Sequence, residues 1–126
     1  MKDINFSQMQ EMQKKIWERN KNNWRPVSPE YARESLLWMM EEIGEVVAII
    51  KKKGDDEIMQ NTEVRAHFTE EIADMLMYLN DVLMRYQISP EEIATAYQDK
   101  HERNMNRDFP AEHAAIVYQN HLKTAE

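Results

Sequence analysis

Apolar residues recur every three to four positions along most of the chain, which is the period of an amphipathic α-helix. No segment shows the sustained two-residue alternation of a half-buried strand. The pattern therefore predicts an all-α, four-helix-bundle type of fold in a single domain, 1–126. We expect four main helices, a polar loop with room for a helical turn, and a short C-terminal helix: 5–23, 28–53, 64–86 and 89–106 for the helices, 55–62 for the loop, and 111–122 for the last helix.

Several helix ends carry specific sequence signals. Asn5 with Gln8 forms a capping box, and Ser28-Pro29 and Ser89-Pro90 each place a capping residue before a proline at the first helical position. Three lysines followed by Gly54 mark the end of the second helix, because cations and a C-terminal glycine both favour that end. These signals fix the approximate helix limits.

The second and third helices each carry an apolar stripe and a neighbouring line that contains carboxylates. The main stripe of the second helix is Leu36, Met40, Ile43, Val47 and Ile50. That of the third helix is Phe68, Ile72, Met75, Leu79, Val82 and Tyr86. The neighbouring lines are Trp38, Glu42, Glu45 and Ile49 on the second helix, and Glu71, Asp74, Tyr78 and Asp81 on the third.

If the two helices pair antiparallel, their carboxylates lie at similar heights. Glu45 lies about 12 Å from the end of its helix, and Asp74 about 15 Å from the start of the next, at about 1.5 Å of rise per residue. Four facing carboxylates repel one another unless they are protonated or bridged by a cation. Oxygen ligands favour a hard ion such as Mg²⁺, with Mn²⁺ as a substitute. Solvated glutamates on helix surfaces are the simpler alternative.

These carboxylates also form a motif. Glu41, Glu42 and Glu45, followed by Glu71 and Asp74, resemble the E-E-x-x-E … E-x-x-D signature of the MazG-like superfamily of all-α NTP pyrophosphatases. The resemblance extends from about residue 36 to residue 107. It implies a house-cleaning enzyme that hydrolyses a nucleoside triphosphate to the monophosphate and pyrophosphate.

The resemblance also implies roles for individual residues. The counterparts of Glu42, Glu45, Glu71 and Asp74 are ligands of Mg²⁺ in the family. Glu41 would act in catalysis, by holding a second ion or orienting water.

Substrate contacts are expected outside the acidic motifs. Lys100, Asn104 and Arg107 resemble the family's basic element and share one helical face, which suits binding of phosphates. Tyr78 resembles a substrate-contacting position, and Trp24 lies in the connector before the second helix. Both aromatic side chains can either stack on a base or fill the core, whereas Trp38 is expected in the core.

Three alternatives to this interpretation can be compared with the sequence. A phosphoribosyl-ATP pyrophosphatase shares the carboxylate layout, and a non-catalytic helical interaction module needs no metal. A ferritin-like di-iron site requires Glu-x-x-His on its helices, yet no carboxylate precedes any of the four histidines by three residues. We therefore expect these histidines at the surface.

Composition narrows the protein class. The chain has 16 basic and 23 acidic residues, and its net charge of −7 disfavours nucleic-acid binding. It has no cysteine, which excludes disulfides, thiol nucleophiles and cysteine-ligated zinc. It has neither the apolar run of a membrane span nor that of a signal peptide, so a cytoplasmic protein is expected. The wide apolar stripes, like the resemblance, predict a homodimer or a dimer of dimers.

Overall fold

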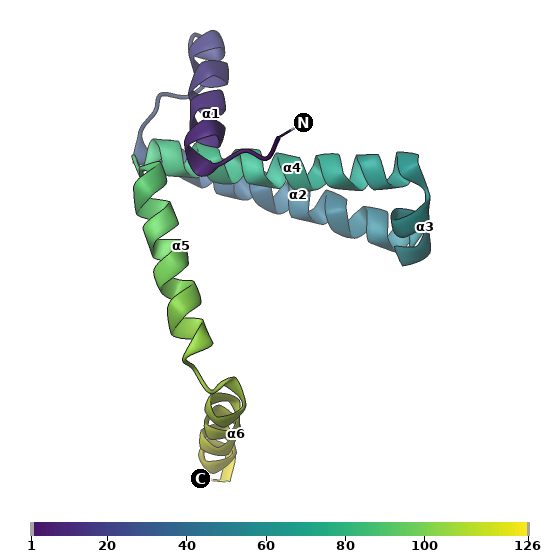
Figure 1. Cartoon of the computed structure of the whole chain (residues 1–126), viewed down its shortest axis with the longest axis vertical. Helices are drawn as coiled ribbons and strands as arrows, with labels where there is room; N and C mark the ends of the chain where they lie inside the picture. Colours follow the sequence, from purple (N-terminus) through teal and green to yellow (C-terminus); the bar gives the residue numbers. More distant parts are fainter. Residues whose placement is uncertain (1, 126) are drawn as a thin grey trace. The chain divides into compact units, whose positions relative to one another are not determined.

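The structure, a computed structural model, describes residues 2–125. These residues form helices joined by short connections and no strand, which confirms the predicted all-α fold (Figure 1). The elements are α1 (Phe6–Asn20), the 3-10 helix η1 (Pro29–Tyr31), α2 (Ala32–Lys53), α3 (Asp55–Gln60), α4 (Thr62–Arg85), α5 (Pro90–Met105) and α6 (Phe109–Ala125).

The chain divides into two compact units, Met1–Glu92 and Ile93–Glu126. The first unit contains α1 to α4, and the second contains most of α5 and all of α6. A single domain over the whole chain stays a prediction. Among the residues that the structure describes, no helix is both long and apolar enough to cross a membrane.

The predicted capping signals account for several helix ends. The Asn5 side chain accepts from the Gln8 amide at 2.9 Å, and the Gln8 side chain accepts from the Asn5 amide at 2.8 Å, which confirms the capping box of α1. α2 ends at Lys53, and Gly54 adopts a φ of 82°, a left-handed conformation that glycine tolerates best. At α5, the Glu92 amide donates to the Ser89 hydroxyl at 3.1 Å.

The predicted start of α2 was too early, and the segment 55–62 is more helical than predicted. Pro29 begins the short 3-10 helix, and Ser28 makes no capping hydrogen bond, so the α-helix itself starts at Ala32. The segment predicted as a polar loop is largely the helix α3. The three acidic residues in its first turn interact favourably with the positive end of the helix dipole, and the buried side chain of Ile58 anchors the helix.

The C-terminal helix is longer than predicted. α6 has 17 residues and begins at Phe109, with Pro110 in its first turn, where proline is tolerated. The Asp108 side chain accepts a hydrogen bond from the Ala111 amide at 3.1 Å. The prediction treated Pro110 as a break, whereas here it lies inside the helix.

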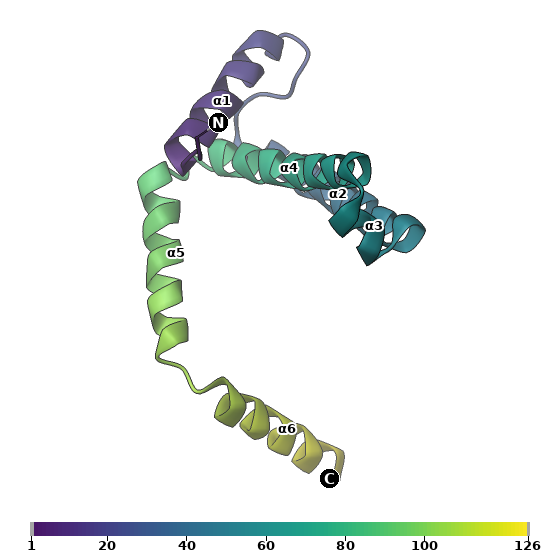
Figure 2. The same cartoon turned by 45° about the vertical axis from the view of Figure 1, so that its right-hand side comes forward.

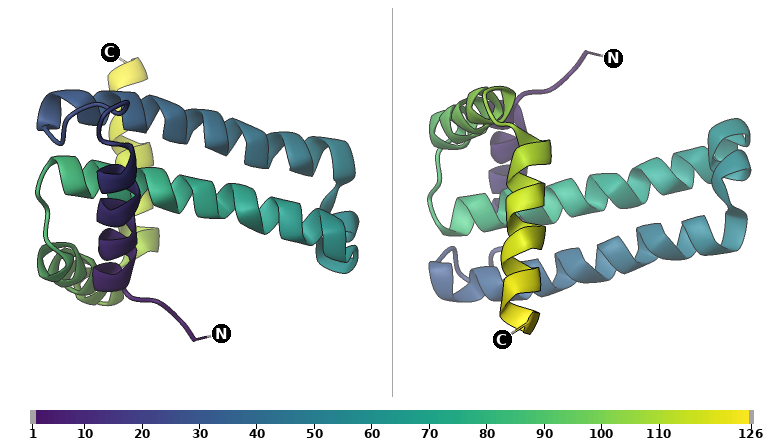
Figure 3. Two further views of the ribbon diagram at one scale, coloured as in Figure 1. Left: turned by 90° about the horizontal axis from the view of Figure 1, so that it is seen from above. Right: turned by 90° about the horizontal axis from the view of Figure 1, so that it is seen from below.

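In the first unit, α2 and α4 lie side by side and antiparallel, with α3 joining their far ends (Figure 3). α1 crosses α4 near the C-terminal end of α4 (Figures 1 and 2). The pair packs through the lines that carry the carboxylates: Ser35 and Ile49 of α2 are buried, as are Asp81 and Arg85 of α4. The predicted antiparallel pairing is therefore confirmed.

The main apolar stripes do not form the core of this unit. All five stripe residues of α2 are at least 39% exposed, and Ile72, Leu79 and Tyr86 of α4 are exposed as well. The reason is geometric, because the lines that carry the carboxylates occupy the contact between α2 and α4, and the stripe of α2 lies on roughly the opposite side of that helix. Each helix consequently presents its widest apolar face outward.

A buried ion pair connects α4 to the other elements. The Arg85 guanidinium donates to the Asp81 carboxylate at 2.7 Å, with both side chains less than one-tenth exposed. The carboxylate also accepts from the Ser35 hydroxyl and, at 3.2 Å, from the Gln13 amide. A second guanidinium nitrogen of Arg85 donates to the backbone carbonyl of Arg25, at 3.3 Å, and to that of Pro26. This cluster joins α1, α2, α4 and the connector between α1 and α2.

We expect Asp81→Ala to destabilise the protein by about 3–5 kcal/mol, because it leaves the buried Arg85 charge without its partner. Urea unfolding at a fixed protein concentration measures the loss. Glu18→Ala, which removes an exposed partner of Lys21, is the control and should change the unfolding free energy by less than about 0.5 kcal/mol. Similar values for both variants would contradict the structural role of the buried pair.

Candidate active site

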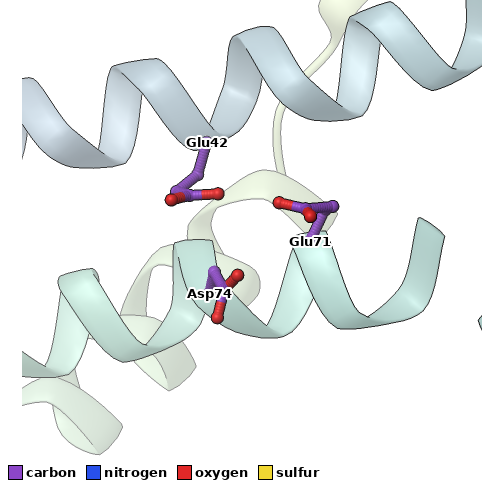
Figure 4. Close-up of side chains that lie close together, drawn as sticks. All are labelled: Glu42, Glu71 and Asp74. Carbon is purple, nitrogen blue, oxygen red and sulfur yellow. The ribbon is translucent and has the colours of Figure 1, made fainter. Parts of the chain in front are cut away.

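Three carboxylates meet across the α2–α4 contact. Glu42 extends from α2 toward Glu71 and Asp74, which lie one helical turn apart on α4 (Figure 4). One ligand oxygen from each residue lies within 4.8 Å of the others, and all three residues are partly buried. Two antiparallel helices thus bring together side chains that are about thirty residues apart in the sequence.

The electrostatics of this cluster favour a bound cation. The pKa of Glu42 is raised from 4.5 to about 7, first by a hydrogen bond shared with Glu71, then by burial and by the charges of Asp74, Glu71 and Glu45. Protonation is one way to relieve repulsion among these groups, and a divalent cation is another. Three oxygen ligands without sulfur or nitrogen fit a hard ion, so the cluster can hold a divalent metal.

Two other acidic residues of the motif lie beside the cluster. Glu45 is exposed and outside the group of three, but its charge contributes to the raised pKa of Glu42. Glu41 is also exposed, and its charge contributes to the raised pKa of Tyr78. Their roles as metal ligand and catalytic group stay predictions.

His67 is a neighbour of the cluster that the sequence analysis missed. Its Nε2 atom lies 3.1 Å from an oxygen of Glu71, while the imidazole itself is 61% exposed. The surface position agrees with the expectation for the histidines. The four-residue spacing between His67 and Glu71 on one helix is the signal that could have indicated this contact.

Tyr78 and Trp38 form an aromatic pair next to the carboxylates. Their ring centroids are 6.0 Å apart, with the ring planes tilted by 58°. Burial, followed by the charges of Glu42 and Asp74, raises the pKa of the Tyr78 hydroxyl above its usual value. Trp38 is 47% exposed, so its predicted core position was wrong: the side chain lies at the edge of the α2–α4 contact.

An open cavity of about 1200 Å³ adjoins the carboxylates within the first unit. Glu42 and Asp74 contribute to its wall, as do Trp24, Trp38 and Tyr78. Trp24 is 40% exposed, and the Trp24 amide donates to the carbonyl of Asn20 at 2.9 Å, which ties the connector to the end of α1. The cavity therefore combines an acidic patch with flat aromatic surfaces.

This arrangement is matched by one comparison with known proteins. A family model described as dATP/dGTP pyrophosphohydrolase matches residues 30–125, which is most of the chain. The chain belongs to this family. It is a nucleoside triphosphate pyrophosphohydrolase with an all-α fold, and the MazG-like resemblance is confirmed. No curated protein and no solved structure matches the chain significantly.

The dATP/dGTP pyrophosphohydrolase family match also covers the second unit, which contains the predicted phosphate-binding residues. Lys100 is exposed on α5. Arg107 follows α5, donates to the Asn104 side chain at 3.1 Å, and pairs with Glu112 at 3.0 Å. These interactions keep Asn104 and Arg107 adjacent. Their contact with a substrate stays a prediction.

The raised pKa of Glu42 predicts a pH-dependent stability without metal. Because the folded pKa of about 7 exceeds the ordinary 4.5, this carboxyl favours folding at low pH, and its contribution is lost as the pH rises through 7. In the presence of a chelator, the unfolding free energy of the wild type should fall more between about pH 5 and pH 8 than that of Glu42→Gln.

Urea titrations at both pH values measure this difference. Glu70→Gln is a matched control, since it neutralises an exposed carboxylate next to Glu71. It should retain the pH dependence of the wild type. Parallel curves for the wild type and Glu42→Gln would show that Glu42 does not carry the shifted proton.

Proposed function

We propose that this pyrophosphohydrolase acts on the purine deoxynucleotides dATP and dGTP and requires Mg²⁺, with Mn²⁺ as a substitute. The observation that carries the proposal is the cluster of Glu42, Glu71 and Asp74 beside a cavity with aromatic walls. The description of the matched family supports the purine preference. Hydrolysis of these triphosphates would remove them from the nucleotide pool of the cell, which fits a cytoplasmic enzyme. This location stays a prediction.

The carboxylates would supply the metal ligands for hydrolysis. Glu42, Glu71 and Asp74 would hold Mg²⁺, with Glu45 as a further ligand from the next turn of α2. When bound, the ion neutralises charge on the triphosphate and on the departing pyrophosphate. Glu41 is an exposed carboxylate next to this cluster and would orient the attacking water toward the α-phosphorus.

Other parts of the chain would bind the substrate. Lys100, Asn104 and Arg107 carry groups that donate hydrogen bonds to phosphate oxygens. Trp24 and Tyr78, whose side chains line the cavity, would stack against the base. Because a purine presents a larger flat surface than a pyrimidine, extended aromatic walls favour it.

We further propose that two copies associate through the outward apolar stripes, as a homodimer or as part of a dimer of dimers. The buried apolar side chains of the described residues are only five: Ala32, Ile49, Ile58, Leu83 and Met84. So small a core is marginal for a chain of this length. A second copy with the same exposed stripes is a self-complementary partner for them.

Activity measurements test the carboxylates as a set. Glu42→Gln, Glu71→Gln and Asp74→Asn should each lower kcat by at least about a hundredfold, because each removes a ligand of the metal that stabilises the transition state.

The products of the wild-type reaction should be a nucleoside monophosphate and pyrophosphate. A panel that includes dATP, dGTP, pyrimidine nucleotides and phosphoribosyl-ATP tests the substrate. Release of a diphosphate and orthophosphate would contradict attack at the α-phosphorus.

Thermal melting provides a measure that does not depend on turnover. Mg²⁺ should raise the Tm of the wild type, because it binds the folded site. It should raise the Tm of Asp74→Asn much less, whereas Glu70→Gln should respond like the wild type. Equal responses in all three proteins would show that the carboxylates do not form the metal site.

Association through the stripes can be tested with Val47→Glu. Val47 is 42% exposed in the single chain, and a buried glutamate at an interface has no partner there. We expect sedimentation at micromolar concentration to give a dimer or tetramer for the wild type and a monomer for Val47→Glu. Lys52→Glu changes an exposed residue on a different face of α2 from the stripe and should leave the assembly intact. A monomeric wild type would contradict the proposal.

A further inference from the structure

Asn80 of α4 has a buried acceptor that no described residue satisfies. The residue is 4% exposed and contributes to the wall of the cavity that adjoins the carboxylates. Its amide nitrogen donates to the Leu76 carbonyl at 2.8 Å and lies 3.7 Å from the Met9 sulfur. Its Oδ1 atom has no hydrogen-bond partner, a state found for no other buried side-chain oxygen or nitrogen among the described residues.

The orientation of this amide is fixed by its surroundings. Rotating the amide by half a turn would place Oδ1 against the Leu76 carbonyl oxygen and replace a hydrogen bond with repulsion between two acceptors. The group that Asn80 leaves free is therefore an acceptor. A buried acceptor without a partner is costly, so a ligand that brings a donor to this oxygen removes that cost.

The neighbouring polar groups do not compete for that role. The Asp81 carboxylate already accepts from Gln13, Ser35 and Arg85. Ser35, which also lines the cavity, uses its hydroxyl donor in this bond, and Gln13 uses one of its two amide N–H groups. Among the buried side-chain acceptors of the described residues, the oxygen of Asn80 is the one without a donor.

The position of Asn80 suits the base of a nucleotide held at the carboxylates. Asn80 follows Asp74 by six residues on the same helix, which is about 9 Å along its axis. That separation is of the same order as the distance from the α-phosphate of a nucleotide to the edge of its base. Tyr78 and Trp38 lie between the two ends of this path and offer surfaces for the sugar and base.

We propose that Asn80 Oδ1 is a specificity-determining acceptor that receives a hydrogen bond from an N–H group on the edge of the nucleobase. In adenine the donor is the 6-amino group, and in guanine it is the neighbouring N1–H. A single acceptor can thus serve both purines, although their substituents at position 6 have opposite hydrogen-bonding character. This inference rests on the proposed function, because it takes the triphosphate to lie at Glu42, Glu71 and Asp74.

The test compares dATP with purine 2′-deoxyriboside 5′-triphosphate, which lacks the 6-amino group and has no donor on that edge. For the wild type, kcat/KM should be about ten- to a hundredfold higher for dATP, because the analogue leaves Oδ1 unpaired. In Asn80→Leu the acceptor is absent, and the two substrates should differ by less than about threefold. Relative to the wild type, Asn80→Leu should have a lower kcat/KM for dATP and an unchanged kcat/KM for the analogue.

Two further variants secure the comparison. Asn80→Ser is smaller, and its hydroxyl can bond back to the Leu76 carbonyl, so it should also lose the preference if Asn80→Leu does not fold. Asn23→Ala removes another amide from the cavity wall and should retain the preference of the wild type. A preference that persists in Asn80→Leu or Asn80→Ser, or equal kcat/KM values in the wild type, would overturn the proposal and leave the pyrophosphohydrolase function intact.

Failure of the proposed function has a different signature. In that case the wild type would release no pyrophosphate from dATP or dGTP. Calorimetric titration with dAMP and with purine 2′-deoxyriboside 5′-monophosphate then decides the role of Asn80. Tighter binding of dAMP that disappears in Asn80→Leu supports the acceptor, and equal affinities overturn it.

Discussion

Repulsion between carboxylates across the α2–α4 contact is the constraint on which the rest of this structure depends. The two helices meet along lines that contain Glu42, Glu71 and Asp74 instead of along their apolar stripes. Packing of this kind places charge where most helical pairs place leucine and valine. It gives up apolar burial within the chain and creates a cluster of carboxylates that can hold a cation.

The same geometry divides the protein into regions with distinct physical roles. Near the middle of the helix pair lies the acidic cluster, and toward the C-terminal end of α4 lies the Asp81–Arg85 cluster, where every charge has a partner. The cavity extends past both. The acidic cluster lacks a cationic partner among the groups that define it, whereas the Asp81–Arg85 cluster is internally paired and holds the surrounding elements together.

The sequence predicted the helices, the antiparallel pair and the facing carboxylates because each depends on local spacing. Capping residues such as Asn5 and Gly54 act within one turn, so they could be identified directly. The outward position of Leu36 and Met40 could not be predicted, because it depends on which face meets the partner helix. The exposed position of Trp38 could not be predicted either, because it depends on where the α2–α4 contact ends. The contact between Arg85 and the carbonyl of Pro26 joins residues far apart in the sequence and has no local signal.

That contact has a consequence for how this enzyme can diversify. Arg85 holds the connector that carries Trp24 through backbone carbonyls, and these are present whatever side chains the connector has. Substitutions at Asn22 or Trp24 can therefore reshape the cavity wall while its attachment to α4 is kept. The connector wall of the cavity and the carboxylate cluster are in this way separable parts of the fold, and the sequence of one can change while the other is kept.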